Sequence, residues 1–187
     1  ENRLDPRLWT GLPAPARRPG GKPRVGWAGG VRHDGDLAMV AGVVRSLAPE
    51  VDWVFFGLCP ERLRPFVAEF HPGVPIGQYP RVLAALDLDL AVAPLEDHPF
   101  NTCKSNLRLL EYGACGYPVV CSDLVPYRGD LPATRVRNRT RDWIEAIRMH
   151  LADRSASVAA GNALREAVRR DWMLEGPHLE SWRRAWL

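Results

Sequence analysis

The sequence predicts a single α/β domain in which helices flank a parallel β-sheet. Its 187 residues are enough for one domain with a substantial core. Short apolar runs alternate along the chain with segments of helical periodicity, and this order is typical of βαβ units in a doubly wound sheet. No internal repeat interrupts that alternation.

Six short apolar segments are expected to form the strands, at residues 22–28, 51–58, 74–77, 88–95, 118–121 and 133–136. The second of them, VDWVFFGL, is almost continuously apolar, as a strand buried on both faces should be. Helical spacing of apolar residues predicts the intervening helices at residues 37–47, 61–70, 81–86, 104–114, 143–151 and 155–170.

The two ends of the chain differ from this pattern. Residues 1–23 are rich in Pro, Gly and Arg and lack periodicity, so we expect a linker or docking arm, followed by the folded domain over residues 24–170. Residues 171–187 carry an apolar stripe at i, i+3 and i+7, made of Leu179, Trp182 and Trp186. The stripe predicts a helix that packs against this domain and toward a second one.

Charge and apolar content narrow the possible functions. The formal net charge is +3, and the Arg residues are spread along the chain without a dense block. This distribution favours a small anionic ligand over a nucleic-acid groove. No window approaches about 18 uninterrupted apolar residues, so a membrane span is not expected. The first residues have no apolar stretch of the kind a signal peptide needs, and they lack an initiator Met, so a fragment or a processed chain is expected.

The four cysteines are expected to be reduced thiols in a cytoplasmic protein. They are Cys59, Cys103, Cys115 and Cys121. None forms a CxxC pair or a Cys/His cluster, so the sequence predicts no metal site.

One segment, NTCKSNLRLLEYGACGYPVVCSD at residues 101–123, combines charged residues on one side of an expected helix with a following apolar strand. Spacings of three, four and seven place Lys104, Arg108 and Glu111 on the same face. Free backbone N–H groups at the first turn, together with Lys104, would make an anion site, and Glu111 deeper in the helix could accept hydrogen bonds from a sugar diol. The alternative, a solvated face with an ion pair worth about 0.3 kcal/mol, stays open from the residues alone.

The same segment carries a resemblance to a known family. LAVAPLEDHPFNTCKSNLRLLEYGACGYPVVCSD and, more loosely, VGWAGGVRHDGDL resemble the C-terminal, donor-binding half of retaining GT-B glycosyltransferases of the group 1 or family 4 type. These enzymes use nucleotide sugars to assemble polysaccharides and lipopolysaccharides. The resemblance extends from Arg24 to the end of the chain, and it implies a Rossmann-like domain with a parallel sheet.

The resemblance also implies a substrate and partners. The donor would be a UDP- or GDP-linked sugar, transferred with retention and without a metal ion or other cofactor. The acceptor would be a saccharide or a lipid-linked saccharide. An N-terminal GT-B domain would complete the active site, and the parent enzyme would be cytoplasmic, with peripheral membrane association possible and no nucleic-acid partner. Because this chain has sequence for one Rossmann-like domain, it is expected to bind a nucleotide but barely transfer sugar by itself.

Roles for individual residues follow from the same resemblance. Glu111 matches the glutamate that binds the ribose hydroxyls, and Lys104 with the backbone amides of Ser105 and Asn106 matches the turn that meets the diphosphate and the donor sugar. Lys104 and Glu111 are therefore the residues expected to carry catalysis. Asn101 is expected to cap the helix beside the donor pocket.

Further donor contacts are expected from two loops. Gly29, Gly30, Arg32 and His33 match the glycine-bearing phosphate loop after the first strand, where Arg32 could supply positive charge. For His33 two interpretations stay open, a phosphate donor or a loop histidine beside a helix cap. Tyr79 falls where the base is usually held and is expected to stack on it.

A departure from the family pattern supports an alternative function. Many relatives carry a second glutamate eight residues before the one at Glu111, and here that position is Cys103. The chain could therefore be a non-catalytic, degenerate GT-B domain that serves as an interaction or assembly module. A dinucleotide-dependent oxidoreductase is disfavoured, because no GxGxxG follows the first strand.

Overall fold

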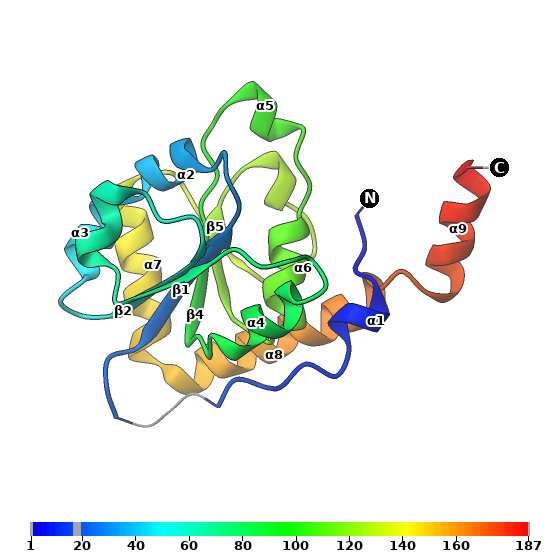
Figure 1. The fold of residues 1–187 in the computed structure, drawn as a ribbon, viewed down its shortest axis with the longest axis horizontal. Coiled ribbons are helices and arrows are strands. Elements are labelled where there is room, and N and C mark those ends of the chain that lie inside the picture. The colour runs from blue at the N-terminus through cyan, green and yellow to red at the C-terminus, as the bar shows by residue number, and fades with distance from the viewer. Residues whose placement is uncertain (1, 17–19, 187) are drawn as a thin grey trace.

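The computed structural model describes residues 2–16 and 20–186 and shows a parallel sheet between two layers of helices (Figure 1). The strand order across the sheet is β3-β2-β1-β4-β5-β6, and every pairing is parallel. The strands are β1 (Arg24–Gly29), β2 (Asp52–Gly57), β3 (Glu69–Pro72), β4 (Leu90–Ala93), β5 (Val119–Ser122) and β6 (Thr134–Val136). The α/β fold class that the sequence predicts is therefore confirmed.

Helices connect successive strands and continue after the last one. Among the described residues they are α1 (Pro6–Trp9), α2 (Asp34–Met39), α3 (Ala41–Leu47), α4 (Tyr79–Ala85), α5 (Pro99–Thr102), α6 (Leu107–Ala114), α7 (Thr140–Ala152), α8 (Arg154–Asp171) and α9 (Gly176–Trp186). Two 3-10 helices, η1 (Glu61–Phe66) and η2 (Val125–Tyr127), complete the connections.

The two faces of the sheet are covered by different helices. Side chains of α2, α3 and α7 form one hydrophobic cluster, and side chains of α4, α6 and α8 form the other. In β2, Trp53 and Phe55 belong to the first cluster, whereas Val54 and Phe56 belong to the second. This alternation places one continuous apolar run into both layers, which is why the strand reads as uniformly apolar.

The strand order creates a crevice at one edge of the sheet. From β1 the chain first builds outward through β2 and β3, and then returns to place β4 on the other side of β1. The loops that follow β1 and β4 therefore diverge at the carboxyl ends of neighbouring strands, where open α/β sheets bind their ligands.

The third strand lies earlier than the sequence predicts. Residues 74–77 were expected to be a strand, but β3 is Glu69–Pro72, which pairs with β2. The Arg24 guanidinium makes a double hydrogen bond to the Glu69 carboxylate at 2.5 and 2.9 Å, and this contact between distant segments fixes the position of the strand. The helix expected at residues 61–70 is shortened to η1, which contains Pro65.

Two expected helices are each split in two. The helix predicted at 37–47 is divided at Val40 into α2 and α3. The helix expected to begin at Lys104 is replaced by α5, a break at residues 103–106, and α6, for which Asn106 is the N-cap residue. The helix α6 ends before Gly116, whose φ of 77° is the left-handed conformation common just after helices.

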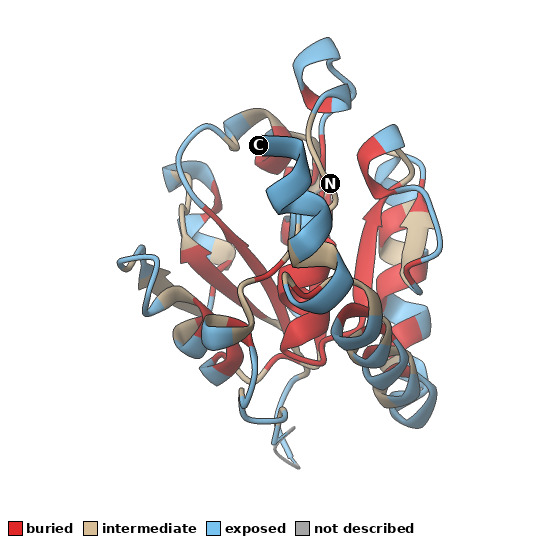
Figure 2. Cartoon of the chain, turned by 90° about the vertical axis from the view of Figure 1, so that its right-hand side faces the viewer, coloured by how far each residue is buried: buried red, intermediate tan, exposed pale blue. Residues whose placement is uncertain are grey.

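The N-terminal arm packs on the domain. Leu4 forms an isolated parallel bridge with Met173, and Trp9 of α1 is buried in the cluster that contains α4 and α6. By contrast, α9 projects from the domain and none of its described side chains is buried (Figures 1 and 2). Its two Trp rings stack on each other with centroids 6.5 Å apart, and the packing of this helix toward a second domain stays a prediction.

Candidate functional site

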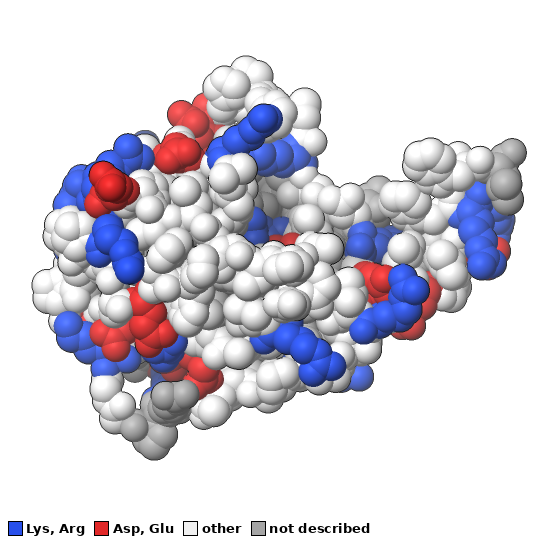
Figure 3. Space-filling model, viewed as in Figure 1, with Lys and Arg blue, Asp and Glu red and all other residues white. Residues whose placement is uncertain are grey.

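A cleft of about 470 Å³ lies at the carboxyl edge of the sheet, next to the switch in strand order. Its walls come from the loops after β1, β4 and β5 and from α6; they include His33, Cys103, Lys104, Ser105, Arg108, Glu111 and Tyr127. The surface is visibly hollowed beside α5, with Lys and Arg side chains at the edge of the hollow (Figure 3).

Glu111 is a buried carboxylate, and one of its two oxygens is hydrogen-bonded to protein side chains. Its Oε2 accepts hydrogen bonds from the Tyr79 hydroxyl at 3.1 Å and from Arg108 Nη1 at 2.8 Å. Arg108 Nη1 also donates to the Tyr79 hydroxyl at 2.8 Å, which closes a triad of three side chains. The other oxygen, Oε1, accepts from no atom of the described residues and is not sealed from solvent, so it remains available to a ligand in the cleft.

The Arg108–Glu111 pair is the ion pair that the solvated-face alternative requires, but it is buried rather than solvated. The two side chains are 18% and 10% exposed. Burial raises the pKa of Glu111 despite the charge of Arg108 and the Tyr79 hydrogen bond. Burial is the largest single influence on Arg108 and opposes its charge, yet the Glu111 carboxylate and the neighbouring Tyr hydroxyls together outweigh it and raise the pKa of the guanidinium. Each side chain of the pair therefore stabilises the charge of the other in surroundings that contain little water.

A second buried carboxylate, Asp36, joins the two loops of the crevice. Its Oδ1 accepts from the Glu96 amide at 2.6 Å and from Asn101 Nδ2 at 3.2 Å. Its Oδ2 lies 2.7 Å from His33 Nδ1 and 3.7 Å from Lys104 Nζ. Burial alone would raise the pKa of Asp36, but the hydrogen bonds from His33 and the Glu96 amide, with the charge of Lys104, lower it. Asp36 therefore stays ionised and holds His33 and Lys104 side by side.

The start of α6 presents donors to the same cleft. Ser105 Oγ accepts from the Leu107 amide at 3.3 Å and from Asn2 Nδ2 at 2.7 Å. The backbone N–H groups of Ser105 and Asn106 donate to no atom within the described part of the chain. Lys104 reaches the cleft from the break before α6 instead of from its first turn, with Nζ 5.6 Å from the centre of the Phe100 ring. These groups make the middle of the cleft electropositive.

The glycine loop is only partly in the cleft. Gly29 is buried at the end of β1, and a Cβ there would lie 3.3 Å from Arg108 Nη2, so the backbone approaches the guanidinium closely. Gly30 and Arg32 are exposed, and neither belongs to the wall of the cleft. His33 does belong to it, and the Asp36 contact orients its ring.

Two expected donor contacts have other partners in the structure. The Tyr79 ring stacks on Phe56 at 5.2 Å and meets the edge of Trp9 at 6.0 Å, so its hydroxyl, rather than a free ring face, faces the site. Asn101 lies inside α5 and donates to Asp36 and to the Glu96 carbonyl at 2.8 Å. Its expected role as a cap of the following helix is wrong, because its side chain donates to these two partners and the N-cap residue of α6 is Asn106.

Sequence reasoning missed two residues of the site. Neither Asp36 nor Tyr127 is among the site residues that the sequence predicts. A carboxylate three residues after His33 was a usable signal for Asp36. Tyr127 gave none, because only the packing of η2 against the cleft brings it there.

Exposed apolar side chains lie at the same edge of the sheet as the cleft. Val31, Ile76, Phe100 and Val125 follow β1, β3, β4 and β5 respectively, and each is more than half exposed. We refer to these four as the apolar rim. Their common position after strand ends places these exposed apolar side chains at the same edge of the sheet as the polar site.

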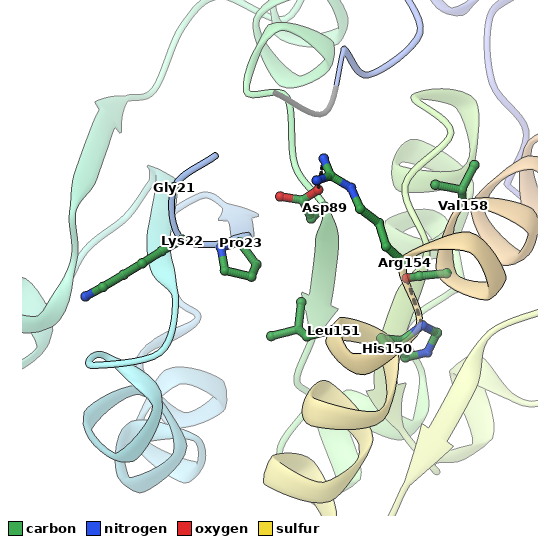
Figure 4. A pocket seen from close by; sticks show the side chains of 9 residues that line it. Gly21, Lys22, Pro23, Asp89, His150, Leu151, Arg154 and Val158 are labelled. Carbon is green, nitrogen blue, oxygen red and sulfur yellow. Dashed lines mark hydrogen bonds and ion pairs between the residues drawn. The ribbon is translucent and has the colours of Figure 1, made fainter. Parts of the chain in front are cut away.

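A smaller cavity, of about 150 Å³, lies at the opposite edge of the sheet (Figure 4). Arg154 reaches across it to Asp89, at 3.2 Å, whereas the Lys22 side chain extends away from both. His150 donates or accepts between Thr134 and Ser157, and burial lowers its pKa. The cavity faces the amino ends of the strands, which is not where sheets of this type bind substrates.

No helix in the described part of the chain is long and apolar enough to cross a membrane.

Comparison with known proteins gives matches only at the level of structure. No family model and no curated protein matches the sequence. Anabaena HepE in complex with UDP has a TM-score of 0.72 and 11% identity, over 98% of this chain and 55% of that one. Sucrose-phosphate synthase from Thermosynechococcus elongatus has a TM-score of 0.70 and 18% identity, over 98% of this chain and 50% of that one. A glycosyltransferase from Rickettsia africae has a TM-score of 0.70 and 11% identity, over 98% and 55%.

This chain spans about half the length of these structures. At such low identities the likeness establishes the fold and not the activity. The chain has the Rossmann-like fold of the C-terminal-like half of GT-B glycosyltransferases, as its sequence predicts.

Proposed function

We propose that the cleft binds a nucleoside diphosphate sugar and that the chain is the donor-binding half of a GT-B glycosyltransferase. The observation that carries this proposal is that Glu111, a buried carboxylate with one oxygen that no group of the described residues engages, lies in the same cleft as the Lys104 ammonium and the His33 imidazole, at the switch in strand order. Such a cleft offers an acceptor for a diol and donors for a diphosphate in one place.

Each group has a defined task in this proposal. Glu111 Oε1 accepts hydrogen bonds from the ribose hydroxyls, while Arg108 and Tyr79 hold Oε2. Lys104 and the amides of Ser105 and Asn106 bind the diphosphate, with His33 beside them. These donors are in place before reaction and stabilise the negative charge that develops on the leaving diphosphate when the glycosyl bond breaks, so transfer needs no metal ion or other cofactor.

The wider assignment is part of the same proposal. A second GT-B domain would close over the cleft and supply the saccharide or lipid-linked acceptor, in polysaccharide or lipopolysaccharide synthesis and with retention at the anomeric carbon. The domain alone would bind nucleotide and barely transfer sugar. HepE, which has this fold, is described in complexes with UDP, with UDP and glucose, and with UDP-glucose, and this supports a UDP-linked donor.

Isothermal titration calorimetry of the chain with UDP, GDP, UDP-glucose and GDP-mannose tests the proposal. We expect binding to at least one nucleotide, weakened more than tenfold in Glu111→Ala and in Lys104→Ala. Glu145→Ala and Lys22→Ala are matched controls outside the cleft, and they should bind like the wild type.

A folded chain that binds none of these nucleotides would refute the proposal. That result would favour the alternative, a non-catalytic interaction module, which the exposed Cys103 in the wall of the cleft supports.

A further inference from the structure

Next to the cleft lies a second cavity, of about 450 Å³, that shares one wall with it. We call this the side cavity. It is lined by polar and charged side chains, among them Asn106, Asp130, Arg170 and His178, and by Trp172. Tyr127 lines both cavities, so its side chain stands at the passage from one to the other.

The Tyr127 hydroxyl differs from the other tyrosine hydroxyls in its hydrogen bonding. The chain has four, and all are described. The hydroxyls of Tyr79, Tyr112 and Tyr117 each have hydrogen-bond partners in the protein. Tyr127 is only 6% exposed, and its hydroxyl bonds to no atom of the described residues. The Tyr127 hydroxyl oxygen is not sealed from solvent, so it opens into the cavities.

An open, unpaired hydroxyl on a buried ring points to a ligand. A buried hydroxyl with no partner costs about 1–3 kcal/mol unless water or a ligand satisfies it. Burial raises the pKa of Tyr127, although the charge of Arg108 opposes this, so the hydroxyl keeps its proton and can donate. The group is therefore a neutral donor and acceptor, as a sugar hydroxyl requires.

The ring is also held in a fixed place. Pro126, which is buried, precedes Tyr127 within η2. The Tyr127 amide donates to the Leu124 carbonyl at 2.9 Å, and its own carbonyl accepts from Arg135 Nε at 2.6 Å. A side chain anchored from both sides of its backbone can select a ligand by the position of its hydroxyl.

The order of the strands indicates which part of a donor would reach Tyr127. Tyr79 and Glu111 meet at the end of the cleft toward α4, Lys104 follows β4, and Tyr127 follows β5, the next strand across the sheet. A donor with its pentose at Glu111 and its diphosphate at Lys104 therefore extends toward Tyr127. We propose that the transferred glycosyl group lies against Tyr127 at the mouth of the side cavity, and that the Tyr127 hydroxyl hydrogen-bonds to a hydroxyl of that sugar. This inference rests on the proposed function.

Calorimetry of Tyr127→Phe with nucleoside diphosphates and with sugar nucleotides tests the inference, because only the sugar nucleotides carry the group in question. We expect the affinity for UDP or GDP to stay within twofold of the wild type. The affinity for UDP-glucose or GDP-mannose should fall about tenfold, as the loss of one hydrogen bond worth about 1.4 kcal/mol would give. Val125→Ala, on the same turn but exposed, should leave all affinities unchanged.

The outcomes separate the two proposals. An equal loss for the nucleoside diphosphate and the sugar nucleotide, or no loss for either, would overturn the inference about Tyr127 while the proposed function stands. Wild-type protein that binds no nucleotide would refute the proposed function and the inference with it. Thermal unfolding of Tyr127→Phe near that of the wild type would show that a selective loss comes from the missing hydroxyl and not from misfolding.

Discussion

Two buried carboxylates in the cleft have opposite pKa shifts because their partners differ. Asp36 accepts hydrogen bonds from a backbone amide and from two side chains and lies 3.7 Å from the Lys104 ammonium, and its pKa is lowered. Glu111 has one cation and one hydroxyl, both on Oε2, and burial raises its pKa. Asp36 is thus a structural anion, whereas Glu111 is a partly satisfied acceptor that a ligand can complete.

The Arg108 guanidinium should be essential to the stability of this arrangement. We expect Arg108→Met to lower the free energy of unfolding by about 3 kcal/mol at pH 7.5, since it leaves Glu111 buried without its cation. In the variant the folded-state pKa of Glu111 lies further above the unfolded value of about 4.3. The protonated form avoids the penalty, so the loss is small below pH 4.3 and grows as pH rises through the folded-state pKa.

Urea unfolding at several pH values measures this effect. Arg141→Met is the control, because Arg141 and its partner Glu145 are 84% and 60% exposed, and its loss should stay below about 0.5 kcal/mol. An Arg108→Met loss that does not change between pH 4 and pH 7.5 would contradict the role given to Glu111.

At the scale of elements, the alternation of strands and helices was readable, but the break before α6 was overlooked. The sequence contains a usable signal for it, because Ser105 and Asn106 are residue types that favour helix starts. The position of β3 had no local signal, since the Arg24–Glu69 contact joins residues 45 positions apart. Glu111 and Lys104, which the sequence predicts to lie on one face of a helix, both line the cleft, whereas the triad with Tyr79 depends on how α4 packs beside α6.

The contact between α8 and the end of α6 makes one glycine irreplaceable. A Cβ on Gly161, in the middle of α8, would lie against the Gly116 carbonyl oxygen and 2.9 Å from the Pro118 nitrogen. Ala normally stabilises a helix interior relative to Gly by about 0.5–1 kcal/mol. Here we expect Gly161→Ala to destabilise by about 2 kcal/mol instead, because two backbone segments must move apart.

Differential scanning calorimetry should show this as a fall of roughly 4–8 °C in Tm. Gly42→Ala in α3 is the matched control, since its Cβ would meet Thr140 Cγ2 at an ordinary 3.5 Å, and its Tm should be unchanged or slightly higher. A Gly161→Ala protein as stable as the wild type would show that α8 can shift away from α6.

At the scale of the whole molecule, the N-terminal arm belongs to the folded domain. The sequence prediction of a linker or docking arm rested on the Pro, Gly and Arg content of residues 1–23, and it gave too little weight to the apolar Leu4 and Trp9. The arm reaches the site as well, because Trp9 packs on Tyr79 and Asn2 donates to Ser105. Compositional rules cannot anticipate such docking, which depends on a groove made by distant segments.

Trp9→Ala should therefore affect both stability and ligand binding. We expect a loss of about 3 kcal/mol in unfolding free energy, typical of a large aromatic residue removed from a core, and weaker nucleotide binding through the loosened Tyr79. Trp186→Ala, at a ring that is 80% exposed, should change stability by less than about 0.5 kcal/mol. Chemical denaturation and calorimetry on both variants measure these effects, and equal behaviour of the two would mean that the arm is not part of the cooperative unit.

The apolar rim affects how unfolding of the isolated chain can be measured. Its side chains are exposed in the native fold, so they offer a binding surface to fluorescent dyes such as ANS, which bind exposed apolar side chains; they are Val31, Ile76, Phe100 and Val125. A dye signal from the isolated chain at room temperature would therefore be a property of correctly folded material. Melting curves recorded with such a dye would start from a high baseline, and far-ultraviolet circular dichroism is the sounder way to follow unfolding.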